Sequence, residues 1–561
     1  MRRGGATAAM LAVAMAALAG CATSAVQPTS RGDAIAATAS GQLRGTSGEG
    51  VERYLGIPYA APPTGEWRWR PPRNPSSWTH LRDASEFGPA CIQPPVPAES
   101  VYNDPPPRMS EDCLNLNVWT PSGARAAPVV VWLHGGSLRI GANSLGLYDG
   151  ANFARRGVVF VSPNYRLGPL GWLAHEELSA ESADGISGNY GLLDQIAALR
   201  WVQDNIAAFG GDPDNVTVMG ESAGALSVTY LMASPKARGL FDKAIVQSTN
   251  LRTFPLLDRP THGLPSAEAI GAQTFADLGI SSLSDARLLD AQALTNRASA
   301  ANFPAQGTID GKVLPDQLVD IFDRGEQARV PLLAGFNSRE VVTQRALLPP
   351  MARSAEDYRA GIVSAYGDLA TDFLALYPYA QGEEALVGAT RDGIYGHAVE
   401  RMVRDQTALG LEAYLFVFDH CYAAADARGL CGFHAGELPF VFGNFATGAL
   451  PAQWPAPGSE EDRALSDAML GYWVSFMKNG RPASSAGPAW PAYANGENFM
   501  RFDGRARPGT DPYPGMFELN EAFNRRRRAS GLSWGFLAGL SAVSANDGGT
   551  GDKNRTSGER E

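Results

Sequence analysis

The segment Val216-Thr217-Val218-Met219-Gly220-Glu221-Ser222-Ala223-Gly224 decides the fold of this 561-residue chain. Its first four residues are mostly apolar and rich in β-branched side chains, like a buried strand, and a helix-length apolar run, Ala223 to Ala233, follows them. Between strand and helix lies the pattern Gly-x-Ser-x-Gly, whose small residues let the two elements approach closely. A serine on such a turn stands above the edge of a sheet, so we predict that Ser222 is a nucleophile.

Five other apolar runs predict strands that are buried on both faces, as in a parallel sheet. They are Val129 to His134, Val158 to Ser162, Ala244 to Gln247, Pro331 to Gly335 and Tyr414 to Phe418. Helix-length patterns separate several of them, notably Gly191 to Phe209. This alternation predicts an α/β fold with a central, mainly parallel sheet, helices on both faces and large loop or helical insertions.

Serine needs a general base to remove its proton, and in this strand–turn–helix arrangement the base follows the nucleophile in the chain. Four histidines do so: His262, His397, His420 and His434. His434 lies in a glycine-containing loop after a predicted strand, a setting that a catalytic base requires, and the other three lack a comparable context. We therefore predict that His434 is the base.

An acid that orients the imidazole is expected at the end of a strand between these two residues. Glu340 follows the predicted strand Pro331 to Gly335 after a short turn, which makes it the predicted acid. An oxyanion hole requires main-chain N–H donors from a second loop. The strand Val129 to His134 leads into Gly135-Gly136-Ser137, which is similar to the His-Gly-Gly-Gly loop of lipases and esterases, with Ser137 replacing the last glycine.

Longer motifs resemble the type-B carboxylesterase/cholinesterase family from about Ala39 to Phe517. They are Tyr54-Leu55-Gly56-Ile57-Pro58-Tyr59-Ala60, Ser110-Glu111-Asp112-Cys113-Leu114-Asn115-Leu116-Asn117, Asn164-Tyr165-Arg166, Phe209-Gly210-Gly211-Asp212-Pro213, Gly220-Glu221-Ser222-Ala223-Gly224, and His434 with Glu437-Leu438-Pro439-Phe440-Val441-Phe442. The resemblance implies an α/β-hydrolase fold, a catalytic triad, an oxyanion hole and a disulfide bridge. The triad would be Ser222, Glu340 and His434, the oxyanion donors Gly136, Ser137 and Ala223, and the bridge Cys91–Cys113.

The expected activity is hydrolysis of small-molecule carboxylic esters through an acyl-enzyme, without a metal or organic cofactor. An amidase or carbamate hydrolase using the same triad is the alternative, and a non-catalytic cholinesterase-like binding module is disfavoured because all three triad residues are retained. Cholinesterases carry a choline-binding Trp between the two cysteines of the bridge, whereas this chain has only Tyr102 there, so choline esters are not expected. Specificity is expected to depend on residues 94–108 and 253–303.

Composition excludes other classes of function. Hydrophobic residues make up 44 % of the chain, which is enough for a sizeable core, and the net charge of -11 has the wrong sign for a nucleic-acid-binding protein. The sequence carries no signal for an oligomeric state.

The N-terminus predicts export. Arg2 and Arg3 precede an apolar run, Ala8 to Leu18, which has the length of a signal peptide. Leu18-Ala19-Gly20-Cys21 resembles the bacterial lipoprotein box, so we predict a signal peptide over residues 1–20, a lipidated Cys21 and an anchor linker over 21–33. A lipoprotein of the periplasm or outer membrane is expected, with a soluble secreted protein or a cytosolic protein with an Ala-rich start as the alternatives.

Four more cysteines fall into two local pairs, Cys91 with Cys113 and Cys421 with Cys431. Local disulfides are the simplest pairing for an exported protein, although spacing alone leaves three connectivities open. The hydrolase domain is expected over residues 34–523. Beyond it, Arg525 to Arg528 and a polar terminus predict a flexible tail over 524–561, with a basic lipid-facing segment as the alternative.

Overall fold

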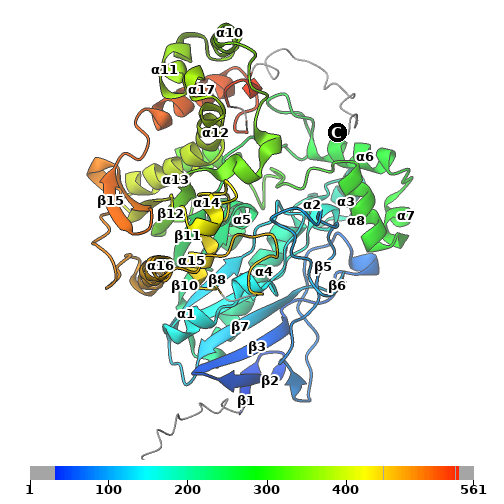
Figure 1. Ribbon diagram of the computed structural model, residues 1–561. Helices are drawn as coiled ribbons and strands as arrows, with labels where there is room; N and C mark the ends of the chain where they lie inside the picture. Colours follow the sequence, from blue (N-terminus) through cyan, green and yellow to red (C-terminus); the bar gives the residue numbers. More distant parts are fainter. Residues whose placement is uncertain (1–31, 446–447, 537, 543–561) are drawn as a thin grey trace, which may run out of the picture.

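The computed structural model describes residues 32–445, 448–536 and 538–542, so the predicted signal peptide and Cys21 lie outside the described residues (Figure 1). A thirteen-stranded sheet crosses this part of the protein, in the order β1-β2-β3-β7-β9-β8-β10-β11-β12-β13-β14-β15 with β4 beside β2, and β5 and β6 form a separate pair. The strands are β1 (Gly32–Thr38), β2 (Gly41–Gly48), β3 (Val51–Pro58), β4 (Arg82–Asp83), β5 (Ala90–Cys91), β6 (Met109–Ser110), β7 (Asn115–Pro121), β8 (Ala127–Leu133), β9 (Val159–Pro163), β10 (Gly211–Glu221), β11 (Lys243–Gln247), β12 (Leu332–Asn337), β13 (Ala413–Phe418), β14 (Asn498–Phe502) and β15 (Ala506–Thr510).

The centre of the sheet is parallel from β9 through β14, and antiparallel strands complete both edges. All six predicted strands lie in this parallel part, which confirms the α/β prediction. Successive residues of one strand enter two different cores: Val218 belongs to the core on one face of β10 and Met219 to the core on the other. The continuous apolar runs in the sequence therefore result from burial on both faces.

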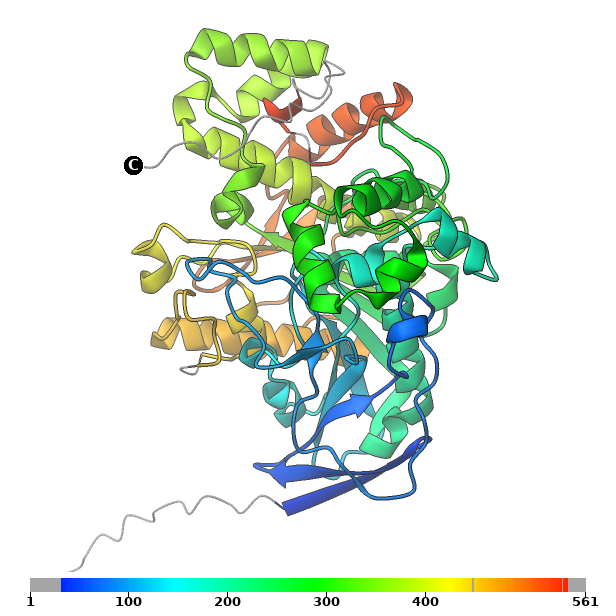
Figure 2. The same cartoon turned by 90° about the vertical axis from the view of Figure 1, so that its right-hand side faces the viewer.

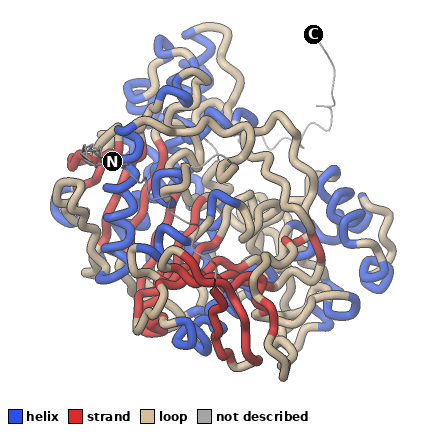
Figure 3. The backbone as a smooth tube through the Cα atoms, turned by 60° about the horizontal axis from the view of Figure 1, so that its bottom comes forward, coloured by secondary structure: helices blue, strands red, loops and turns tan. Residues whose placement is uncertain are grey.

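Helices cover both faces of the sheet (Figure 3). Residues of α4, α5 and α13 contribute to one core, and residues of α1, α15 and α16 contribute to the other. The helices are α1 (Ala151–Arg155), α2 (Gly168–Trp172), α3 (Glu176–Glu181), α4 (Tyr190–Asn205), α5 (Ala223–Ala233), α6 (Ala267–Asp277), α7 (Leu283–Leu288), α8 (Ala291–Ala300), α9 (Leu318–Asp323), α10 (Ala355–Tyr366), α11 (Ala370–Leu376), α12 (Glu383–Arg391), α13 (His397–Ala408), α14 (Ala423–Asp426), α15 (Leu438–Phe442), α16 (Glu460–Asn479) and α17 (Met516–Ala529).

Two helical insertions extend beyond the sheet. Helices α6, α7 and α8 lie together between β11 and β12 in the chain, and α10, α11 and α12 gather with α17 at the end of the molecule opposite the N-terminal hairpin (Figures 1 and 2). The second group has a hydrophobic core of its own, which includes Tyr366, Phe373 and Phe523. No helix in the described ranges is long and apolar enough to cross a membrane.

Both predicted domain boundaries need correction. Strand β1 begins at Gly32, inside the predicted linker, because its residues pair with β2 from that point onward. Helix α17 continues to Ala529 across the predicted boundary at 523/524. Arg526 pairs with Asp368, so the arginine run joins two elements of the fold where a flexible tail was expected. The described residues after α17 pack as well, and those after 542 lie outside the described part of the protein.

Trp534 is the main anchor of the segment after α17. Its side chain is 2 % exposed, and its main chain exchanges hydrogen bonds with Thr253. We expect Trp534→Ala to lower the free energy of unfolding by about 3–5 kcal/mol, because it leaves a large cavity in the core. Urea denaturation of the two proteins measures this difference. The control is Leu288→Ala, since Leu288 is 86 % exposed; equal effects of the two substitutions would contradict the packed C-terminal segment.

Candidate active site

The turn from β10 into α5 gives Ser222 its position. Ser222 has φ 56° and ψ −122°, a strained conformation for a residue with a side chain. The flanking glycines are required by close packing: a Cβ on Gly224 would lie 1.9 Å from the carbonyl oxygen of Leu133, and one on Gly220 would lie 2.4 Å from the main chain of Gly224. The hydroxyl therefore projects from a turn that only small neighbours permit.

Ser222, His434 and Glu340 come from three separate loops and form one hydrogen-bonded chain. The Oγ of Ser222 lies 2.8 Å from Nε2 of His434, and Nδ1 of His434 lies 2.6 Å from Oε2 of Glu340. Glu340 and His434 are buried. Glu340 follows β12, in a 3₁₀ turn that begins at Glu340 itself, and His434 follows β13. The structure thus brings together the three residues that the sequence selected.

The other three candidate histidines have different partners. His420 contacts Asp462 at 2.7 Å, His397 contacts Glu521 at 2.9 Å, and the ring of His262 packs edge-on against Trp534. Each is thereby accounted for by a local contact away from Ser222.

Two further groups hold the carboxylate of Glu340. Its Oε1 accepts hydrogen bonds from the hydroxyl of Ser248 at 2.6 Å and from the main-chain N–H of Asn337 at 2.7 Å. Ser248 follows β11 directly and has φ 60°, so the same edge of the sheet supplies this contact. Ser248 was not among the predicted site residues, although its place at the end of a predicted strand was a usable signal.

A second buried carboxylate lies behind Glu340. Oε1 of Glu437 accepts from Nε2 of Gln247 at 2.7 Å, and Oε2 accepts from Nδ2 of Asn337 at 2.6 Å. The same Asn337 amide donates to the carbonyl of Phe433 at 2.7 Å, which ties the loop of the acid to the loop of His434. Burial raises the pKa of Glu437.

The loop after β8 presents unused main-chain donors. Gly136 has φ 107° and Ser137 has φ 56°, and the carbonyl of Gly136 accepts from the N–H groups of Arg139 and Ile140. Within the described residues, nothing accepts a hydrogen bond from the N–H groups of Gly136, Ser137 and Ala223. These are the three donors implied by the resemblance.

His134 supports this loop as a neutral residue. Burial lowers its pKa to about 4, and its Nδ1 lies 2.9 Å from the carbonyl of Gly135. Tyr165 stacks on the imidazole at 4.5 Å between ring centroids and donates to the carbonyl of His134 at 2.7 Å. The loop is therefore held by packing and main-chain hydrogen bonds.

Glu221 adds a third carboxylate beside His434. Its Oε1 lies 3.2 Å from Nε2 of His434, and burial raises the pKa of Glu221 to about 8. Burial disfavours protonation of His434, but the charges of Glu221 and Glu340 outweigh it and raise the pKa of His434 to about 9. Glu221 belongs to the motif that resembles the family, but it was not predicted as a site residue.

Two tyrosines flank the imidazole of His434. The ring centroid of Tyr395 lies 5.1 Å from that of His434, and its hydroxyl donates to Oε1 of Gln344 at 2.7 Å. Tyr395 belongs to a π-helical turn over Asp392–Gly396. Tyr102 approaches from the other loop, with its hydroxyl 2.6 Å from Oγ1 of Thr343. Neither tyrosine was predicted as a site residue.

A cavity of about 450 Å³ opens onto Ser222 and His434. Its walls include residues of the proline-rich segment before Met109 and of α8, which belong to the two segments expected to determine specificity. Most of the lining side chains are apolar or aromatic. The residues are Gln93, Pro94, Pro95, Val96, Tyr102, Asn103, Asp104, Pro105, Pro106, Met109, Gly135, Gly136, Ser137, Ile140, Gly141, Leu145, Leu147, Tyr148, Glu221, Ser222, Gln292, Asn296, Gln344, His434, Ala435, Leu438, Pro451 and Trp454.

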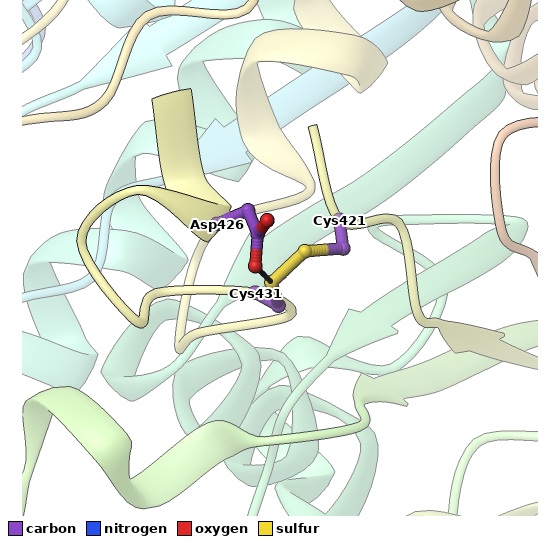
Figure 4. Close-up of side chains that lie close together, drawn as sticks. All are labelled: Cys421, Asp426 and Cys431. Carbon is purple, nitrogen blue, oxygen red and sulfur yellow. Dashed lines mark hydrogen bonds between the residues drawn. A yellow bond between two sulfur atoms is a disulfide. The ribbon is translucent and has the colours of Figure 1, made fainter. Parts of the chain in front are cut away.

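Both predicted disulfides are present in the structure. Cys91–Cys113 closes the proline-rich segment that lines the cavity, and Cys421–Cys431 closes a short loop that ends three residues before His434 (Figure 4). Asp426 lies beside the second bridge, with Oδ1 3.9 Å from Sγ of Cys431. A disulfide sulfur is not a thiolate, so in this oxidised form the three side chains do not make a metal site.

Comparison with known proteins identifies the family. The model of the carboxylesterase family matches residues 32–513. The chain belongs to the carboxylesterase family. The para-nitrobenzyl esterase of Bacillus subtilis (strain 168) is 36 % identical to this chain over 467 residues. The match covers 82 % of this chain and 92 % of that protein. The fumonisin B1 esterase of Sphingopyxis macrogoltabida is 35 % identical over 483 residues, which cover 84 % of this chain and 87 % of that esterase.

Solved carboxylesterase structures have the same fold. A PNB esterase superposes with a TM-score of 0.75 at 33 % identity, over 86 % of this chain and 99 % of the esterase. A Geobacillus stearothermophilus carboxylesterase gives a TM-score of 0.70 at 32 % identity, over 86 % and 99 % of the two chains. The predicted family and α/β-hydrolase fold are thereby confirmed, and the protein is a carboxylic ester hydrolase.

The raised pKa of His434 predicts an alkaline activity profile. A protonated imidazole cannot accept the proton of Ser222, so kcat/KM is expected to increase with pH, with a midpoint above the ordinary value of 6.5. Replacing Glu221 with Gln removes a negative charge from beside His434. We expect this change to move the midpoint to lower pH by about one unit or more.

A pH profile of kcat/KM on a neutral ester measures both midpoints. Glu176→Gln is the control, because Glu176 is an exposed carboxylate on α3. Superimposable profiles for the native protein and Glu221→Gln would contradict the electrostatic role of Glu221.

Proposed function

We propose that this carboxylesterase cleaves small-molecule esters through a covalent acyl-enzyme on Ser222. The observation that carries the proposal is the unbroken chain from Ser222 Oγ to His434 and on to Glu340, with separations of 2.8 and 2.6 Å, at the floor of a cavity. A nucleophile, a base and an orienting acid in this order are the elements of serine acyl transfer.

Acylation begins when Nε2 of His434 accepts the proton of Ser222 as Oγ attacks the ester carbonyl. Glu340 holds Nδ1 of the imidazole and stabilises the imidazolium that forms, and its own orientation is fixed by Ser248 and Asn337. His434 then gives its proton to the departing alcohol. In the second half-reaction His434 activates a water, which attacks the acyl group and regenerates Ser222.

The tetrahedral intermediate carries a negative oxygen that needs hydrogen-bond donors. The N–H groups of Gly136, Ser137 and Ala223 are the proposed donors, since they have no partner in the described part of the protein. Because these donors are main-chain groups, the Ser137 that replaces the usual glycine supplies the same N–H. One such donor typically contributes about 2.7–4 kcal/mol to transition-state stabilisation.

Replacing Ser222 with Ala tests the nucleophile. We expect kcat on p-nitrophenyl acetate to decrease by roughly 10⁴- to 10⁶-fold and covalent labelling by a fluorophosphonate probe to disappear, because among the described residues only the hydroxyl of Ser222 contacts His434 Nε2. Ser284→Ala, which removes an exposed hydroxyl, is the matched control and should retain both signals. Undiminished hydrolysis by a folded Ser222→Ala protein would refute the mechanism.

We also propose that the protein is exported and held at a membrane by lipid on Cys21. The lipoprotein-type motif Leu18-Ala19-Gly20-Cys21 supports this proposal, and the two disulfides are typical of oxidising compartments.

Lipidation is tested by expressing the full chain in a Gram-negative host fed with an alkyne fatty acid. The native protein should incorporate the label and partition into the detergent phase of Triton X-114, and Cys21→Ser should do neither. Equal behaviour of the two proteins would exclude the anchor without affecting the esterase proposal.

A further inference from the structure

The cavity above Ser222 has an unbalanced charge. Among the described residues that line it, the acidic side chains are Asp104 and Glu221, the one basic side chain is His434, and no lysine or arginine is present. Glu221 lies at the floor, where it contacts His434. Asp104 lies on the proline-rich segment between Cys91 and Cys113, so the two acidic groups come from different parts of the chain.

Asp104 lacks a counter-ion. Its side chain is half-buried, yet among the described residues its carboxylate accepts no hydrogen bond and forms no ion pair; only its main-chain N–H is engaged, with the carbonyl of Tyr102. Burial raises the pKa of Asp104, which shows that the surroundings disfavour its charge. A partly buried, unpaired carboxylate costs free energy, and a bound cation would recover part of that cost.

Aromatic rings accompany this carboxylate. Tyr102, Tyr148 and Trp454 line the same cavity, and the charge of Asp104 is among the influences that raise the pKa of Tyr148, after burial. Ring faces attract cations, and a carboxylate adds a direct partner for an N–H donor. The proline-rich segment contains no tryptophan, but Trp454, from a different part of the chain, supplies an aromatic ring to the same cavity.

We propose that the cavity selects esters that carry a protonated amine over neutral esters, that it discriminates against esters that carry a carboxylate, and that Asp104 is the selecting residue. This inference rests on the proposed function, because it assigns a substrate class to the same cavity. An ammonium group would take the position beside Asp104 while the ester carbonyl lies at Ser222. A substrate carboxylate in that position would meet the unpaired negative charge of Asp104, with no lysine or arginine beside it.

The test compares esters of equal shape and different charge. One series consists of acetates of alcohols of equal chain length that end in dimethylammonium, isopropyl or carboxylate groups, and a second series places the same groups at the end of the acyl chain. Acid release in a pH-stat gives kcat/KM for each. We expect the dimethylammonium ester to exceed the isopropyl ester by about tenfold or more in at least one series, and the carboxylate ester to be the poorest in that series.

Asp104→Asn assigns the preference to one residue. This variant should reduce the ratio of kcat/KM for the dimethylammonium ester to kcat/KM for the isopropyl ester by about fivefold or more. Glu99→Gln is the matched control, because Glu99 is an exposed carboxylate on the same segment and does not line the cavity. It should leave the preference unchanged.

The outcomes separate this inference from the proposed function. Hydrolysis of the isopropyl ester that depends on Ser222, together with a preference near one in both series, would overturn the inference and leave the esterase mechanism intact. A preference that persists in Asp104→Asn would overturn the assignment to Asp104. If that variant does not fold, the ratios of the native protein still decide whether the cavity selects cations, and failure to hydrolyse any of the esters would count against the proposed function itself.

Discussion

The close approach of α5 to the ends of β8 and β10 is the constraint on which the rest of the site depends. The space is so tight that a methyl group at Gly224 would overlap the carbonyl of Leu133. This contact forces Ser222 into its strained backbone conformation and aims the start of α5 at the cavity. The same contact brings the start of α5 against the loop after β8, so one packing contact positions both the proposed nucleophile and the proposed oxyanion donors.

The parallel sheet also positions the other side chains of the site. Because β10, β11, β12 and β13 are adjacent and parallel, their carboxyl ends meet at one edge. Ser222, Ser248, Glu340 and His434 each follow one of these strands, and the contacts between them cross from loop to loop. The disulfide Cys421–Cys431 and the amide of Asn337 restrain the loop of His434, which is the longest of these connections before its functional residue.

The sequence predicted those parts of the fold and of the site that produce a recognisable pattern over a few neighbouring residues. Strands that are buried on both faces appear as continuous apolar runs, and the glycines beside Ser222 indicate the tight turn. The fold and the three hydrogen-bonded residues, Ser222, His434 and Glu340, could therefore be predicted from the sequence. Tyr395 could not be found in this way, because a π-helical turn has no characteristic spacing. The C-terminal boundary was wrong for a related reason: Arg525 to Arg528 resemble a solvated tail until the acidic partners of Arg526 and Arg528, which lie far away in the chain, are known.

The buried surroundings of His434 contain more carboxylates than a protein interior usually holds. Three carboxylates, Glu221, Glu340 and Glu437, lie near one buried imidazole, an arrangement that is unfavourable while the imidazole is neutral. Ester hydrolysis passes through states in which the imidazole is positive, and these are the states that the carboxylates stabilise. The same charges make His434 keep its proton up to higher pH, so stabilisation of the transition state is obtained at the expense of activity at neutral and acidic pH. Negative charge near Ser222 also affects which substrates bind. The acid–base chemistry of His434 and the proposed selectivity of the cavity thus depend on the same kind of group, a buried or half-buried carboxylate.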